Sequence, residues 1–140
     1  KCNLHKADFI HLAWSCPAVL QYCTEVFETV SLMVEDNIEP DIHLALLGDV
    51  LAIPTHNRQF IAITLLLARR TVAMAWMRTS SPTVQLWLAD LAYCKGQLEI
   101  YVEDLHHKSR PKINRVPIAH TYYNCLMRMN RTHNWIGFCN

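Results

Sequence analysis

The sequence predicts an all-α protein, an irregular bundle of four to five helices. Three observations favour this class over a β-sandwich or barrel. Only three glycines occur in 140 residues, 51% of the residues are hydrophobic, and long stretches carry Leu, Ala, Val and Met without turn residues. A chain of this length can bury one core, so we expect a single compact domain with small appendages.

The first long helix is predicted over residues 17–35. Pro17 suits the first helical position, Ser15 or Cys16 can cap it, and apolar residues recur at helical spacing through the segment. The acidic, proline-containing stretch EDNIEPD ends this helix. The following IHLALLGDV then predicts a short helix that stops near Gly48.

A second long helix is predicted over residues 58–78, with Asn57 as its N-cap. It is apolar around most of its circumference and is therefore expected at the centre of the core. Its most apolar run, FIAITLLLA at 60–68, meets Arg69 and Arg70 and falls short of the roughly 18 apolar residues that span a bilayer. We expect this run to be a buried helix segment, with no membrane as partner.

The last helical pattern begins at Ser80-Ser81-Pro82, which offers another cap followed by a proline. Apolar residues continue at helical spacing to about residue 105, in one helix or in two. We expect a break near Lys95-Gly96. Beyond Ser109 the pattern loosens, and AHTYYNCLMRM predicts a last short helix.

The charge distribution separates a basic end from an acidic body. The first 105 residues hold seven Lys or Arg and twelve Asp or Glu, whereas residues 106–140 contain no acid and six basic residues: Lys108, Arg110, Lys112, Arg115, Arg128 and Arg131. We divide the chain into a segment over 1–16, whose ligand spacing described below predicts a partial zinc knuckle, a helical domain over 17–105 and a basic, aromatic-containing C-terminal segment over 106–140.

The cysteines indicate a reducing compartment. Six occur, but they are widely scattered, and the apolar content suffices for an ordinary core without a disulfide framework. No apolar stretch behind a basic leader marks a signal peptide. An intracellular location, nuclear or cytoplasmic, is favoured.

The opening segment KCNLHKADFIHLAWSCP contains residues with the spacing of zinc ligands. Cys2, His11 and Cys16 supply three of the four N or S ligands that a structural zinc requires, and Cys16 lies at a helix N-terminus that favours its thiolate. The fourth ligand is His5 or a cysteine upstream of Lys1. Without a neighbouring acidic base such a site is structural, not catalytic. The alternative is two ordinary cysteines and a coincidental histidine.

Several runs together resemble a known family. The run ADFIHLAWSCPAVLQYCTEVFETV, an ALLGD turn and LLLARRTVAMAWMRTSSPTVQLWLADL are similar to the C-terminal zinc-knuckle region of LINE-type (non-LTR) retrotransposon reverse transcriptase polyproteins, common in fish and amphibian genomes. The similarity covers roughly Cys2 to Tyr101. No single residue is specific to the family, but the order and spacing of the matching residues together are. These residues are His11, Trp14, Cys16, Pro17, Arg69, Arg70, Trp76, Pro82 and Trp87.

The resemblance implies a role in binding the RNA or DNA of such an element beside the reverse transcriptase domain. It also implies that Cys2, His11 and Cys16 are three of four zinc ligands. Two stretches depart from the family pattern: LHHKSRPKINRVPIAHTYYN follows it only roughly, and NRTHNWIGFCN does not match it.

The basic residues have an interpretation that does not depend on the resemblance. The six after residue 105, interleaved with aromatic side chains, supply charge for phosphate and faces for base stacking, and Arg69 and Arg70 are further candidates. The alternative is that the six basic residues after residue 105 form a solvated tail whose charge balances that of the acidic body. The alternative for Arg69-Arg70 is an ion pair with an acid such as Asp90 or Glu28.

The sequence thus predicts a non-catalytic nucleic-acid-binding accessory module with a possible structural zinc ion. No nucleophile elbow, glycine-rich phosphate loop or paired acidic polymerase motif occurs in the chain, so we expect no enzyme. The alternatives are a structural or protein-interaction helical domain with a structural metal, and a decayed element remnant without activity.

Overall fold

The computed structural model describes residues 8–76, 78 and 80–107, with side-chain positions as far as residue 97. These residues form five helical elements and no strand, which confirms the predicted all-α class. The elements are η1 (His11–Ser15), α1 (Pro17–Val34), α2 (Ile42–Leu47), α3 (Thr55–Trp76) and α4 (Val84–His107). The predicted short helix AHTYYNCLMRM lies outside the described residues.

Helix α1 forms as predicted and ends one residue earlier. Pro17 occupies the first turn after Cys16, which has extended backbone, and the helix closes at Glu35 in the left-handed region (φ 56°). The backbone N–H of Glu35 donates to the carbonyl of Ser31. The local signals of a proline start and an acidic, proline-containing end were therefore sufficient to place this helix.

Helix α2 is short and is defined by its two caps. The carboxylate of Asp41 accepts a hydrogen bond from the backbone N–H of Leu44 at 2.7 Å. Gly48 ends the helix with φ 72°, and its N–H donates to the carbonyls of the last turn. The predicted stop near Gly48 is confirmed.

Helix α3 begins earlier than predicted, at Thr55, and ends at Trp76. The proposed cap Asn57 lies inside the first turn, where it is buried and its N–H donates to the carbonyl of Pro54 at 2.9 Å. The prediction was wrong because Pro54 precedes a turn that is already helical, so Asn57 is not the residue at the helix boundary. The helix contacts η1, α1, α2 and α4, which confirms its expected place in the core.

By length and composition alone, α3 is also apolar enough to cross a membrane. The same composition characterises the central helix of a soluble bundle. The run over 60–68, predicted to be buried, is buried on its inward side, whereas Leu66 is exposed and Ala62, Ile63 and Leu67 are half-buried. The covered residues are Phe60, Ile61, Thr64, Leu65 and Ala68.

Helix α4 is continuous through Gly96, so the predicted break at Lys95-Gly96 is wrong. A Cβ added at Gly96 would meet nothing within 4 Å, and the backbone there does not have positive φ. A single glycine costs a helix only about 1 kcal/mol relative to alanine, which is too little to interrupt a helix of 24 residues. The helix begins at Val84 rather than at Pro82.

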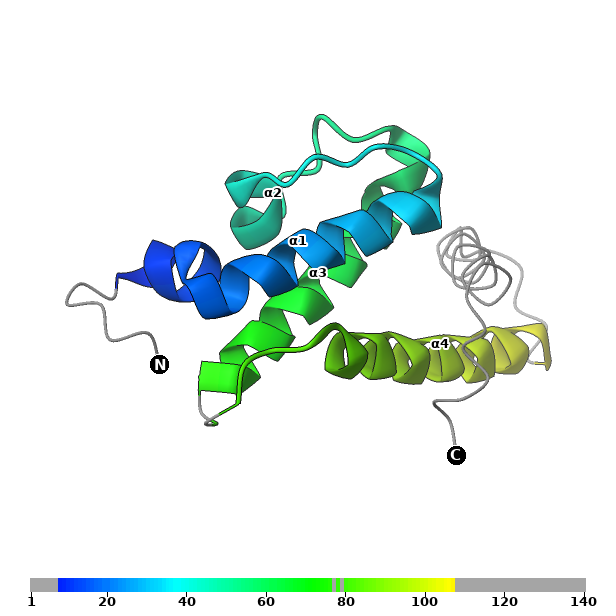
Figure 1. Cartoon of the computed structure of the whole chain (residues 1–140). Coiled ribbons are helices and arrows are strands. Elements are labelled where there is room, and N and C mark those ends of the chain that lie inside the picture. Colours follow the sequence, from blue (N-terminus) through cyan, green and yellow to red (C-terminus); the bar gives the residue numbers. More distant parts are fainter. Residues whose placement is uncertain (1–7, 77, 79, 108–140) are drawn as a thin grey trace.

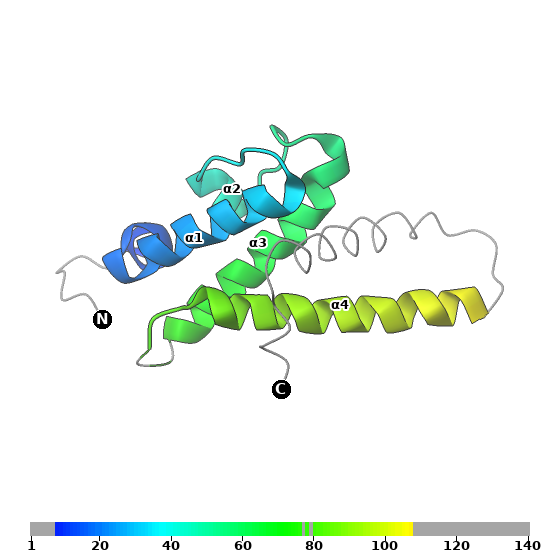
Figure 2. The ribbon, with the colours of Figure 1, turned by 45° about the vertical axis from the view of Figure 1, so that its right-hand side comes forward.

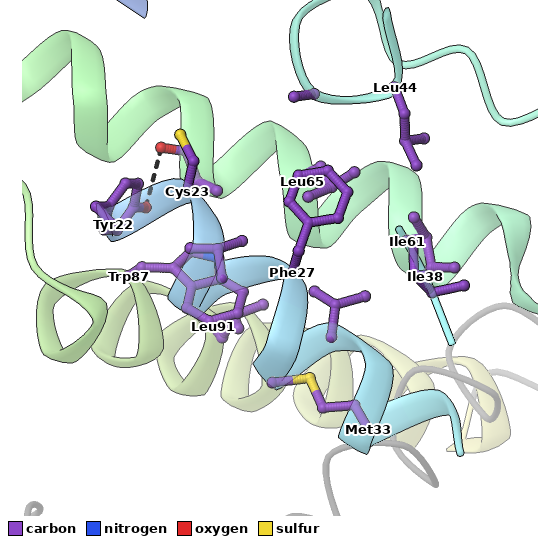
Figure 3. Packing of buried hydrophobic residues seen from close by; sticks show 14 of the residues in the cluster. Tyr22, Cys23, Phe27, Met33, Ile38, Leu44, Ile61, Leu65, Trp87 and Leu91 are labelled. Atoms are coloured by element: carbon purple, nitrogen blue, oxygen red, sulfur yellow. Dashed lines mark hydrogen bonds between the residues drawn. The ribbon is translucent and has the colours of Figure 1, made fainter. Parts of the chain in front are cut away.

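The helices are arranged around the crossing of α1 and α3. Helices α2 and α4 lie on opposite sides of this pair (Figures 1 and 2). Figure 3 shows Trp87 and Leu91 extending from α4 toward the side chains of α1 and α3. The indole N–H of Trp87, which is fully buried, donates to the carbonyl of Thr64 at 3.0 Å and so joins α4 to α3.

The described part of the N-terminal segment, which begins at residue 8, is mostly helical. Residues 9 and 10 are helical and η1 follows directly to Ser15. This segment packs on α1 and α3. It is held there by the indole N–H of Trp76, which donates to the carbonyl of Leu12 at 3.2 Å, and by an edge-to-face contact of Phe9 with Trp76.

Candidate nucleic-acid interface

A polar depression of about 160 Å³ lies between the end of α3 and the start of α4. Two arginines, Arg70 and Arg78, line it together with three hydroxyl-bearing residues, Thr71, Ser80 and Ser81. Asp90 of α4 also lines it. Because α3 ends and α4 begins here, residues of the connecting segment, such as Arg78 and Ser80, line the same depression as residues of the two helices.

The first turn of α4 adds a partial positive charge to this surface. Its four N-terminal N–H groups have no partner within the helix, and its first turn contains no acidic residue. One of these groups, the N–H of Leu86, donates at 3.4 Å to the hydroxyl of Thr83. Leu86 itself lines the depression, so this helix terminus lies at its edge.

The depression is only modestly positive because Arg70 is paired. Its guanidinium forms an ion pair with Asp90, one of the two partners that the sequence suggested. Arg78 is exposed and forms no ion pair with any residue that the structure describes. The excess positive charge of the depression therefore comes from Arg78 and from the start of α4.

Arg69 and Arg70 lie on different sides of α3, although they are adjacent in the sequence. Arg69 turns toward α2, where its Nη1 donates to the carbonyl of Leu46 at 2.8 Å. Consecutive residues of a helix point about 100° apart, so two neighbouring arginines cannot both follow one surface. Of the predicted nucleic-acid-binding residues within the described chain, Arg70 alone lines the depression.

The remaining predicted nucleic-acid-binding residues, Lys108, Arg110, Lys112, Arg115, Arg128 and Arg131, lie outside the described residues. Sequence reasoning did not identify Arg78, Ser80 and Ser81 as site residues. The sequence did contain a signal for these residues. Ser80 and Ser81 were assigned to helix capping, but they also follow Arg78 closely and precede a long helix. Hydroxyls and a guanidinium at such a position are also suited to bind an anion.

Two of the predicted zinc ligands are described, and they lie at the two ends of η1. His11 is half-buried at its start, and the buried Cys16 follows its end. The N–H of Cys16 donates to the carbonyl of His11 at 2.8 Å. Cys2 and His5 lie outside the described residues. Within the described ranges, no three His, Cys, Asp or Glu side chains are grouped so as to hold a metal.

A second, apolar cavity of about 230 Å³ lies among η1, α1, α2 and α3. Tyr22 and Cys23 of α1 form part of its wall, and Arg69 contributes the cationic group. Burial raises the pKa of the Cys23 thiol to about 11 and also raises the pKa of Tyr22, whose hydroxyl donates to the carbonyl of Ala68. Both groups are therefore neutral at pH 7.

No protein-family model, curated protein or solved structure matches the chain.

Proposed function

We propose that the chain is a non-catalytic nucleic-acid-binding accessory module that contacts the phosphate backbone through the turn between α3 and α4. The observation that carries the proposal is the gathering of Arg70, Arg78, Ser80 and Ser81 in one depression beside the start of α4. Guanidinium groups, hydroxyls and helix N-termini are the groups that contact phosphates in protein–nucleic acid complexes.

The charge of the chain limits where the nucleic acid binds. The described body carries more acids than bases, so the depression is a local contact rather than part of a continuous basic face. The six basic residues after residue 105 supply further phosphate-neutralising charge. Contacts of this kind fix the position of a strand and do not select its sequence.

The test is fluorescence anisotropy with a labelled single-stranded RNA and a DNA of the same sequence, titrated at several salt concentrations. Arg78→Gln is expected to reduce the slope of log K against log salt by about 0.7, the value for one phosphate contact on a single strand. Arg78→Lys keeps the charge and is expected to retain the slope. Undetectable binding at low salt, or a slope unchanged by Arg78→Gln, would contradict the proposal.

The ion pair of Arg70 with Asp90 provides a second test, in which a substitution is expected to strengthen nucleic-acid binding. Asp90→Asn removes a negative charge from the depression and frees Arg70 for phosphate, so binding should strengthen by roughly fivefold, equivalent to about 1 kcal/mol. Asp49→Asn makes the same change of charge at an exposed position that does not line the depression. Equal effects of the two variants would show that only net charge matters.

A protein-interaction domain is the second candidate, and a different observation favours it. Large apolar side chains at the edge of the apolar cavity are exposed, among them Phe9 and Trp76. Exposed apolar groups that gather around a concave surface are typical of binding sites. This candidate predicts that Asp90→Asn and Arg78→Gln leave all binding properties of the chain unchanged.

A further inference from the structure

The apolar cavity among η1, α1, α2 and α3 has a chemistry distinct from that of the polar depression. Its lining is almost entirely carbon, and five of the lining residues are aromatic: Phe9, Trp14, Tyr22, Phe27 and Trp76. Trp14 packs edge-to-face on Phe27 at a ring-centroid distance of 6.0 Å, which fixes the wall on the α1 side. Such a surface favours a ligand with an apolar body.

The cation in the wall restricts the choice of ligand. Arg69 is half-buried, its Nε is fully covered and has no hydrogen-bond partner, and no carboxylate of the described residues forms an ion pair with it. Its one described hydrogen bond is to the neutral carbonyl of Leu46. A partly desolvated cation is unfavourable unless an anion accompanies it, so the wall is complementary to a negatively charged group.

We propose that this cavity binds a small amphiphilic carboxylate, with its apolar chain among the aromatic side chains and its carboxylate beside the guanidinium of Arg69. The volume sets the size of the ligand. A cavity of about 150 Å³ accommodates benzene, so 230 Å³ has room for roughly ten heavy atoms. This is the size of a medium-chain fatty acid, and a phospholipid with two chains is too large.

The neutral wall groups agree with this assignment. The thiol of Cys23 and the hydroxyl of Tyr22 keep their protons at pH 7, so neither adds a negative charge that would repel a carboxylate. Arg69 is then the charged group that the described wall presents to the ligand.

The test uses the tryptophans in the wall. Octanoate, octanol and octylamine, each kept below the concentration at which it forms micelles or separates from water, are titrated into the full chain while tryptophan fluorescence is recorded. Octanoate is expected to bind saturably with a Kd on the order of 0.1–1 mM. Octanol should bind about tenfold more weakly, because it lacks the charge-assisted hydrogen bond, and octylamine should be weaker still. Equal affinity for octanoate and octanol would overturn the proposal, as would the absence of saturable octanoate binding.

A pair of variants isolates the role of the cation. Arg69→Gln is expected to weaken octanoate binding about tenfold and to leave octanol binding unchanged. Arg58→Gln is the matched control, because Arg58 is also half-buried and donates to two backbone carbonyls, those of Leu51 and Ile53, but does not line the cavity. Octanoate binding unaffected by Arg69→Gln, or equally affected by both variants, would overturn the assignment.

The role of the cavity itself is tested by filling it. Ala68 is buried in the wall of the cavity, so the larger side chain of Ala68→Leu should occupy ligand space. This variant is expected to reduce the affinities for octanoate and octanol by about tenfold each. Ala89→Leu adds the same atoms at an exposed position of α4 and should change neither affinity. Circular dichroism of each variant verifies that it is folded. Octanoate binding that survives in a folded Ala68→Leu variant would place the ligand elsewhere.

Discussion

At the scale of single residues, the four arginines of the described body show how differently one side chain can be used. Arg58 holds the loop before α3 by donating to backbone carbonyls, and Arg69 holds α2 in the same way. Arg70 is paired with Asp90 across α3 and α4, whereas Arg78 is exposed. Of the four, Arg70 and Arg78 line the polar depression.

Cys23 leads to a prediction for alkaline pH. Burial raises its pKa from 9.0 to about 11, so between these values the unfolded thiol loses its proton while the folded thiol keeps it. Unfolding then releases a proton, and the free energy of unfolding should fall as the pH rises from 9 to 11, by at most about 1.4 kcal/mol per pH unit for this group.

Urea unfolding at pH 8 and pH 10.5 measures this effect. Cys23→Ala should lose less stability between the two pH values than the unmodified chain, although Tyr22, whose pKa is also raised, continues to contribute. Cys94→Ala is the comparison: partial burial also raises the pKa of Cys94, but this thiol is only half-buried, so its removal should change the loss of stability less than Cys23→Ala does. The same loss of stability in the unmodified chain and in Cys23→Ala would show that the thiol does not carry the effect.

At the scale of the elements, the two described glycines serve different purposes. Gly48 ends α2 in the left-handed region, which a residue with a Cβ adopts only at a cost. Gly96 lies within α4, where an added Cβ would meet nothing within 4 Å. Glycine at the first position is a conformational requirement, and glycine at the second is a weakness that the helix tolerates.

Replacing each glycine separately by alanine should therefore change the free energy of unfolding in opposite directions. Gly96→Ala is expected to raise the free energy of unfolding by about 0.5–1 kcal/mol, because alanine favours the helix. Gly48→Ala is expected to lower it by about 1–2 kcal/mol. The added Cβ meets the Arg69 guanidinium only at an ordinary 3.6 Å, so this loss reflects backbone strain. Urea midpoints measured by circular dichroism test both values, and destabilisation by Gly96→Ala would contradict an unbroken α4.

At the scale of the whole molecule, α3 separates two surfaces of opposite character. The apolar cavity is lined by residues of η1, α1, α2 and α3, and the polar depression by residues of α3, α4 and the segment between them. Helices α2 and α4 lie on opposite sides of the pair formed by α1 and α3 (Figures 1 and 2). Between them the core joins α1, α3 and α4 through large buried side chains that include Phe27, Phe60 and Trp87. The stability of both surfaces therefore depends on the same core.

Trp87 is the residue on which this dependence can be measured. It is fully buried and joins α4 to α3 by a hydrogen bond, so Trp87→Ala should cost about 3–5 kcal/mol, a large share of the roughly 5–15 kcal/mol that stabilises a domain. Trp76→Ala is the matched control, because Trp76 is 42% exposed, and it should cost less. The comparison is made by urea unfolding followed by circular dichroism. A smaller loss for Trp87→Ala than for Trp76→Ala would contradict the described core.

The sequence alone determined the all-α class, and it placed α1 and α2 closely because their boundaries depend on local signals. Pro17 at a helix start and Gly48 at a helix end act within one turn of the backbone. The start of α3 and the continuity of α4 were predicted wrongly. Whether Asn57 is a cap or a buried residue, and whether Gly96 breaks a helix, depends on the elements around them.

The candidate site was predictable only in part. The sequence offered Asp90 or Glu28 as a partner for an arginine of the pair at 69–70, but choosing between them requires knowing which helix packs on α3. The tertiary structure alone assigned Arg69 to the apolar cavity and Arg70 to the polar depression, and it brought Arg78, Ser80 and Ser81 beside the latter. Sequence patterns specify the faces of a helix, whereas the packing of one helix on another decides what each face meets.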